Sequence, residues 1–128
     1  MPITNHWADP EKTLLLVEFE GLFDWEAYYA SMTEFQKMVT GVSHRVDCIA
    51  DTRNGDAPSG NPLPHFRAFV NKLPDNIGVF VLVADKALYR QLTNIVISVY
   101  RQSSGRQIYM VYTLESAHAL VEEARRGM

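Results

Sequence analysis

Apolar runs of strand length alternate with stretches of helical periodicity along this 128-residue chain, and few folds accommodate that order. The alternating runs predict five strands, over residues 3–7, 12–20, 44–51, 77–84 and 107–112. Apolar residues at helical spacing predict four helices, over residues 24–40, 62–73, 85–102 and 113–124. Strands that alternate with helices form a mostly parallel sheet covered by helices. The expected class is α/β, in the order ββαβαβαβα, with an N-terminal β-hairpin, a mixed and mostly parallel sheet, four helices and a single domain over residues 1–128.

Each predicted helix has a face that can be assigned to the core. In the longest helix, the inward stripe is expected to contain Leu88, Leu92, Ile95, Val96 and Val99. The single cysteine, Cys48, lies in a strand-like run, where a thiol is either a small buried hydrophobe or a reactive group.

Composition restricts the classes of partner and the cellular location. A formal net charge of −3 argues against a nucleic-acid backbone as partner, because such binding needs a basic face. The N-terminal residues lack the basic and apolar regions of a secretory signal, and no apolar run approaches the ~18 residues of a membrane span. We therefore expect a cytoplasmic protein without a membrane span.

One irregular segment interrupts the alternation, over residues 51–61 with the sequence DTRNGDAPSGN. Working loops of helix-covered parallel sheets lie beyond the carboxyl ends of the strands, so this segment is a candidate functional loop. It does not match a calcium-binding loop, since Arg53 and Gly55 occupy ligand positions, and it lacks the Gly-Lys-Ser/Thr ending of a phosphate loop. The four histidines have no zinc-ligand spacing, so we expect neither a metal nor a cofactor.

The sequence contains one candidate set of catalytic residues. Asp51, Arg53 and His65 would meet if the strand end and the following helix converge. His65 would also meet Ser59 as a base, but no third catalytic member is visible. The sequence therefore favours a protein that is not an enzyme.

Aromatic residues gather on the first and third predicted helices. They exceed what one inward stripe can bury, because adjacent residues such as Tyr28 and Tyr29 lie about 100° apart around a helix. Either a tyrosine keeps its hydroxyl in water, or these helices border an apolar groove for a small apolar ligand or for a second copy in a homodimer. The candidate groove residues are Trp25, Tyr28, Tyr29, Tyr89 and Tyr100.

Three stretches resemble a known family, namely residues 19–25 (FEGLFDW), 48–53 (CIADTR) and 112–117 (YTLESA). With the element order, they make the chain similar to the STAS domains of sulfate transporters and anti-sigma-factor antagonists, and most of all to the stand-alone SpoIIAA-like branch, which is related to Sec14-like domains. The resemblance covers nearly the whole chain, although its motifs are loose.

The resemblance implies a regulatory protein-interaction module without enzymatic activity, which binds an unidentified protein partner.

Many family members are switched by phosphorylation at the start of the second helix, in a motif close to Asp-Ser-Ser-Gly. The corresponding stretch here is residues 56–60 (DAPSG), which keeps a Ser-Gly pair but inserts Ala57 and Pro58. Ser59 is the candidate phosphosite, or else a turn serine that helps to cap the helix. The candidate switch loop contains Asp51, Thr52, Arg53, Asp56, Gly60 and Asn61. Some SpoIIAA-like and Sec14-related proteins are thought instead to hold apolar ligands, so a carrier or sensor of a small lipid-like molecule is the alternative.

Overall fold

The computed structural model describes residues 2–127, apart from the side chain of Ser103. Its elements follow the predicted order ββαβαβαβα. The strands are β1 (Ile3–Trp7), β2 (Leu14–Leu22), β3 (Val46–Asp56), β4 (Ile77–Val83) and β5 (Gln107–Val111). The helices are α1 (Trp25–Thr40), α2 (Leu63–Asn71), α3 (Ala87–Ser104) and α4 (Leu114–Arg126).

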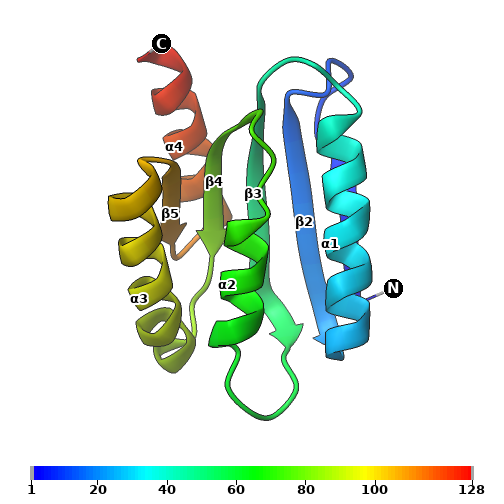
Figure 1. The fold of residues 1–128 in the computed structure, drawn as a ribbon, viewed down its shortest axis with the longest axis vertical. Coiled ribbons are helices and arrows are strands. Elements are labelled where there is room, and N and C mark those ends of the chain that lie inside the picture. The colour runs from blue at the N-terminus through cyan, green and yellow to red at the C-terminus, as the bar shows by residue number, and fades with distance from the viewer. Residues whose placement is uncertain (1, 128) are drawn as a thin grey trace.

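The strands lie in the sheet in their chain order, β1-β2-β3-β4-β5. β1 pairs with β2 in antiparallel fashion and the other neighbours are parallel, as the α/β prediction required. Helices α1, α2 and α3 each connect one parallel strand to its next neighbour in the sheet, always in the same direction across the sheet. Because such connections are right-handed, all three helices lie on the same face of the sheet. Figure 1 shows these three helices side by side in front of the strands, with α2 in the middle and α4 behind.

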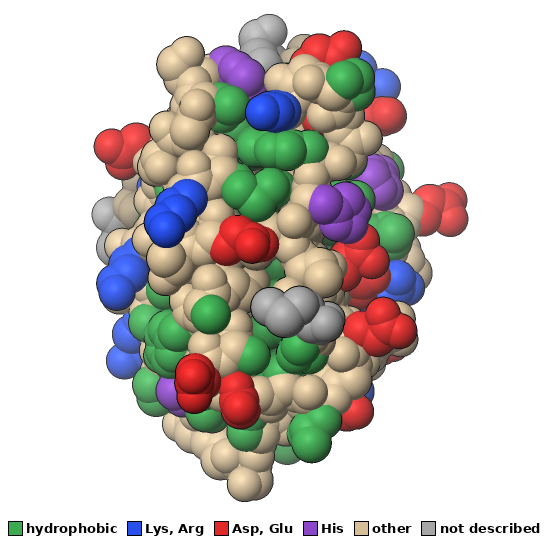
Figure 2. Space-filling view, turned by 90° about the vertical axis from the view of Figure 1, so that its right-hand side faces the viewer, with side chains coloured by type: hydrophobic (Ala, Val, Ile, Leu, Met, Phe, Trp, Pro, Cys, Tyr) green, Lys and Arg blue, Asp and Glu red, His purple; other side chains and the backbone are tan. Residues whose placement is uncertain are grey.

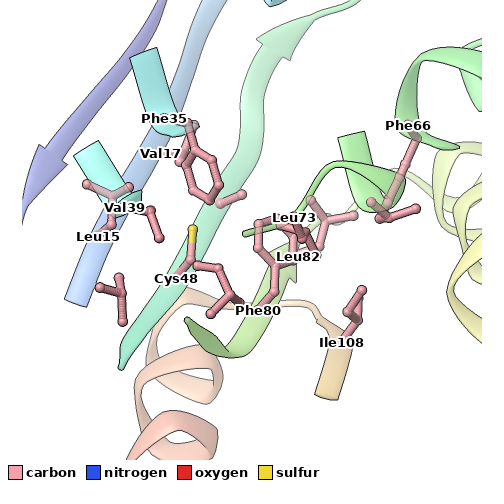
Figure 3. Close-up of a cluster of buried hydrophobic side chains, with 14 of the residues drawn as sticks. Leu15, Val17, Phe35, Val39, Cys48, Phe66, Leu73, Phe80, Leu82 and Ile108 are labelled. Carbon is pink, nitrogen blue, oxygen red and sulfur yellow. The ribbon is translucent and has the colours of Figure 1, made fainter. Parts of the chain in front are cut away.

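Two apolar cores follow from this one-sided arrangement. The larger lies between the sheet and the layer of α1, α2 and α3, and it contains Phe35, Val39, Cys48, Phe66 and Phe80 (Figure 3). The smaller lies under α4, where Ala117 and Val121 pack on β3 and β4. Side chains of a strand alternate between faces, so Cys48 and Ala50 enter the first core and Ile49 enters the second.

A buried carboxylate connects α4 to the sheet. Asp47 is 1% exposed, and its Oδ1 accepts hydrogen bonds from Arg45 Nε at 3.0 Å and from the Val79 amide at 2.9 Å. Its Oδ2 accepts a hydrogen bond from Arg125 Nε at 2.7 Å. Gly78 makes room for this group, because a Cβ there would overlap the Arg45 guanidinium and lie 2.6 Å from Asp47 Oδ1.

Two sequence predictions about local structure are wrong. The third strand continues to Asp56, so residues 51–56 of the predicted irregular segment are β-structure that pairs with the end of β2, and only residues 57–62 connect β3 to α2. The inward stripe of α3 is also different: Val96 and Ile97 are buried, whereas Leu88, Ile95 and Val99 are 69%, 60% and 60% exposed.

Cys48 is fully buried, and burial, with a further contribution from the charge of Asp47, raises the pKa of its thiol. This environment matches the buried, unreactive interpretation of the cysteine.

The described surface is mixed in character. Figure 2 views the edge that α1 and β1 form, where acidic and hydrophobic side chains are interspersed. Among the described helices, none has the length and apolar character needed to cross a membrane. Within residues 2–127, no group of three His, Cys, Asp or Glu side chains is placed to hold a metal ion.

Candidate functional site

A pocket of about 190 Å³ opens where β2 and β3 end and where α1, α2 and α3 begin. We call it the aromatic pocket. Its lining residues are Phe19, Phe23, Trp25, Tyr28, Thr52, Gly55, Ala57, Pro62, Phe66, Lys86 and Tyr89. A narrower cavity of about 50 Å³ lies deeper, between the sheet and the helices. The two spaces share part of their lining, namely Phe19, Tyr28, Thr52, Phe66 and Tyr89.

The floor of the aromatic pocket depends on a close approach between β2 and β3. The β2 strand has an irregularity between Glu18 and Glu20, after which Gly21 pairs with Gly55. A Cβ on Gly55 would lie 2.7 Å from the Cβ of Phe19, so this position needs glycine. Phe19 and Phe23 then pack edge to face at 5.3 Å, and their rings form one wall of the pocket.

An aromatic cluster joins the first turn of α1 to the first turn of α2. The rings of Trp25 and His65 are stacked with centroids 3.7 Å apart, and Trp25 packs edge to face on Tyr28 at 5.3 Å. The Tyr29 hydroxyl forms a 2.7 Å hydrogen bond with His65 Nδ1. The Tyr28 hydroxyl donates to the His65 carbonyl oxygen at 3.1 Å. Two helices that are far apart in sequence are thereby fixed around the pocket mouth.

The polar side chains of the pocket are the hydroxyl-bearing Tyr28, Thr52 and Tyr89, and Lys86 at the rim. Thr52 Oγ1 donates to the Val83 carbonyl at 2.8 Å, which leaves its oxygen able to accept a hydrogen bond. The hydroxyl of Tyr89 has no hydrogen-bond partner among the described residues. Burial raises the pKa of Tyr89 to about 12, and burial together with the neighbouring Tyr89 and Tyr29 raises the pKa of Tyr28. Both tyrosines are therefore neutral at physiological pH.

The rim of the pocket contains the loop between β3 and α2. Ala57 and Pro62, at the two ends of that loop, both line the pocket. Lys86 Nζ donates to the Gly55 carbonyl at 2.9 Å and lies 3.9 Å from Asp56 Oδ1. Lys86 is therefore held beside the end of β3, and the loop forms part of the pocket rim.

Comparison with known proteins gives one informative match. No family model matches the chain, and no curated protein matches it. A solved structure from Shewanella loihica PV-4, an uncharacterized protein from the DUF3478 family with a SpoIIAA-like fold, is similar with a TM-score of 0.62. The match has 11% sequence identity and covers 92% of this chain and 90% of that chain. The fold is SpoIIAA-like. At this identity the likeness shows the fold and nothing about activity.

The SpoIIAA-like fold places three of the five predicted groove residues in the aromatic pocket, namely Trp25, Tyr28 and Tyr89. Tyr29 lies outside with its ring against His65, and Tyr100 lines a separate groove between α2 and α3. The prediction of a groove between the first and third helices is wrong, because α2 lies between them (Figure 1). Phe19, Phe23 and Phe66 line the pocket too, but sequence periodicity assigns such residues only to a core.

The candidate switch residues lie on different sides of the sheet. Thr52 faces the helix layer and lines the pocket, whereas strand alternation places Asp51 and Arg53 on the side of α4. The carboxylate of Asp51 accepts two hydrogen bonds from the Arg53 guanidinium, at 2.9 and 2.8 Å. Burial alone would raise the pKa of Asp51, but the hydrogen bonds and charge of Arg53 lower it. This pair stabilises the strand end and takes no part in the pocket.

The remaining switch residues lie at the loop. Asp56, Ser59, Gly60 and Asn61 are exposed. Gly60 has a φ of +109°, a conformation that requires glycine. Asn61 Oδ1 accepts a hydrogen bond from the Leu63 amide at 3.1 Å, although the N-cap residue of α2 is Pro62. The ring of His65 contacts Trp25, Tyr28 and Tyr29, and it is on the other side of the sheet from Asp51 and Arg53. The catalytic set considered from sequence is therefore not assembled.

Proposed function

We propose that this protein is a non-enzymatic sensor that binds a small apolar ligand in the aromatic pocket and presents the bound state to a protein partner through the loop of residues 57–62. The supporting observation is that this loop borders the pocket at both of its ends, at Ala57 and Pro62. Occupancy of the pocket and the conformation of the loop are then coupled, because a ligand has differential contacts with open and closed arrangements of the loop.

The dimensions and polarity of the pocket support a particular class of ligand. A cavity of about 150 Å³ is sufficient for benzene, and the aromatic pocket is of about 190 Å³. Its walls are aromatic, its lysine is already engaged, and the Tyr89 hydroxyl offers a free O–H. We therefore expect an uncharged compound with one ring and a hydrogen-bond acceptor, such as a carbonyl oxygen.

The same geometry supports a binding role over catalysis. Tyr28 and Tyr89 have raised pKa values, so neither supplies a base at neutral pH. The ionised carboxylate of Asp51 is paired with Arg53 on the side of α4. A pocket of neutral hydroxyls and aromatic rings is suited to hold a ligand without changing it.

Thermal denaturation and native mass spectrometry in the presence of acetophenone or indole test this proposal. Acetophenone is expected to raise the Tm, because a ligand that binds the folded state at a hundredfold over Kd adds about 2.7 kcal/mol of stability. Tyr89→Phe keeps the ring and removes the O–H, and it should weaken acetophenone binding about 3- to 10-fold. Tyr100→Phe, on the same helix but outside the pocket, is the matched control and should bind as the wild type does. The sensor role would be contradicted if neither compound changed the Tm and if native mass spectrometry of gently purified protein showed only the mass of the ligand-free chain.

Phosphorylation of Ser59 is a second candidate mode of regulation, supported by the exposure of this residue in the loop that borders the pocket. A phosphate there adds about −1.5 to −2 charge. Ser59→Asp should change amide hydrogen exchange in the loop and the acetophenone affinity, whereas Ser43→Asp, at an exposed serine remote in sequence, should change neither. Equal behaviour of the two variants, with no phosphate found on Ser59 in protein purified from its own cells, would exclude this mode.

A further inference from the structure

Helix α3 has apolar residues on two of its faces. One face packs on the sheet through Val96 and Ile97. The second face, which we call the outer stripe, contains Leu88, Leu92, Ile95 and Val99. At 100° per residue these four side chains fall within about 60° of one another. Three of them are exposed by 60% or more, and Leu92 is half-buried.

The spacing of the outer stripe is symmetric under reversal. The intervals along the helix are four, three and four residues, from Leu88 to Leu92, Ile95 and Val99. A two-fold axis near the middle of the stripe therefore places Leu88 of one copy opposite Val99 of the other, and Leu92 opposite Ile95. Alternating three- and four-residue intervals are the pattern that packs helices side by side at a small crossing angle.

The surroundings of the outer stripe also fit a second copy of the chain. The polar residues along its solvent side, Gln91, Ser98 and Gln102, are uncharged, so two copies meet there without like charges opposite each other. On its other side lies a groove of about 190 Å³ between α2 and α3, which is lined by the exposed Arg67 together with Val70, Asn71, Ile95, Val96, Val99 and Tyr100. In the two-fold arrangement, Leu88 of the second copy lies against Val99, at the edge of this groove.

We infer that the chain forms a two-fold symmetric homodimer in which the outer stripes of two α3 helices pack antiparallel. The helix has 18 residues and is about 27 Å long. One helix pair is smaller than the roughly 800 Å² per partner of a standard interface, so we expect the dimer to be weak. The aromatic pocket does not include the outer stripe, so dimerisation and ligand binding are separate properties.

Sedimentation equilibrium between about 1 and 200 μM tests the association, since a weak dimer should appear over this range. The wild-type protein is expected to shift from monomer to dimer as concentration rises. Ile95→Asp and Leu88→Lys each place a charge in the contact and should weaken association at least 10-fold. Both side chains are exposed, so the variants should fold, as circular dichroism will check. Leu22→Asp alters an equally exposed leucine, 78% exposed at the end of β2, and should leave association unchanged.

Cysteine cross-linking tests the antiparallel arrangement, because the natural Cys48 is buried and does not interfere. Leu88→Cys mixed with Val99→Cys should be joined by a short bifunctional maleimide, whereas Leu88→Cys alone should not. A wild-type protein that stays monomeric to the highest concentration would overturn the inference. So would dissociation by Leu22→Asp but not by Ile95→Asp, or efficient cross-linking of Leu88→Cys to itself.

Discussion

Asp47 holds together three segments that are far apart in the sequence. Its carboxylate contacts Arg45, the Val79 amide in β4 and Arg125 near the end of α4. The side chain of Asp47 is 2% exposed, whereas the side chains of Arg45 and Arg125 are 30% and 36% exposed. Removing this carboxylate therefore leaves the buried Val79 amide without its acceptor, while the two guanidinium groups stay partly solvated. The importance of Asp47 therefore lies in joining β3, β4 and α4 through one buried carboxylate.

Asp47→Ala should lower the free energy of unfolding by about 1–3 kcal/mol, measured by urea denaturation, because it leaves the buried Val79 amide unpaired. Asp51→Ala is the matched control: it removes another carboxylate of β3, on a side chain that is 15% exposed where that of Asp47 is 2% exposed. That change should cost about 1 kcal/mol or less. Similar losses in the two variants would contradict the role assigned to the Asp47 network.

Tyr89, like Tyr28, is a tyrosine whose raised pKa makes the folded state less stable in alkaline solution. Burial raises its pKa from 10.0 to about 12. The folded state therefore holds the phenolic proton more tightly than the unfolded state does, so the stabilisation is complete below pH 10 and is lost as pH rises from 10 to 12. The loss amounts to at most about 1.4 kcal/mol per pH unit for this group.

Denaturation profiles of Tyr89→Phe should consequently fall less steeply between pH 10 and 12 than those of the wild type. Tyr112→Phe alters an exposed tyrosine and should keep the wild-type slope. If the two variants have the same slope, Tyr89 is not ionising with a raised pKa. The shape of the pocket is retained in Tyr89→Phe, so a change of slope reports the hydroxyl and not a loss of packing.

At the scale of elements, the start of α1 determines the shape of the pocket mouth. Asp24 Oδ1 accepts a hydrogen bond from the Ala27 amide at 2.7 Å and caps the helix. Trp25 and Tyr28 lie in the turn that this cap secures. A loosened cap therefore affects both helix stability and the pocket.

Asp24→Ala should reduce the free energy of unfolding by about 1 kcal/mol in urea denaturation and should weaken acetophenone binding in the same samples. Asp24→Ser retains a capping oxygen and should restore most of both properties. Full recovery by Asp24→Ser would assign the effect to the cap. Failure of that variant to recover either property would show that the charge of Asp24 acts in another way.

The elements also show where sequence reasoning is sufficient and where it is not. Periodicity placed the hairpin and the four helices, because this signal acts within a few residues. Residues 54–56 (NGD) have a turn-like composition, yet they form strand because Gly55 is buried against Phe19 and pairs with β2. At these residues the contact of Gly55 with Phe19 and the pairing with β2 determine the structure, against the turn propensity of the local sequence.

The candidate site was predicted only in part, for a related reason. Aromatic excess on two helices pointed to Trp25, Tyr28 and Tyr89, but the strand order that inserts α2 between those helices is not a local property. The inner face of α3 was misassigned because this helix is apolar on two faces, and periodicity alone does not say which one meets the sheet.

At the scale of the whole molecule, the helices are unevenly distributed about the sheet. Three crossover helices cover one face, and α4 covers the other over β3, β4 and β5 (Figure 1). The middle strands β3 and β4 are thus covered on both sides, as their continuous apolar character requires. The edge strand β1 pairs with a single neighbour, β2.

This layering predicts the order of amide hydrogen exchange. Amides of residues 48–51 and 79–83 should exchange most slowly, through global unfolding, because they lie in paired strands with buried side chains. Amides of β1 should exchange earlier, and those of loop 57–62 first. Acetophenone should slow exchange at the loop and at the first turns of α1 and α2, since these border the pocket, and leave β5 unchanged. If acetophenone slowed exchange evenly over all strands, the ligand would stabilise the fold without contacting the loop. The proposed coupling between the pocket and the loop would then be contradicted.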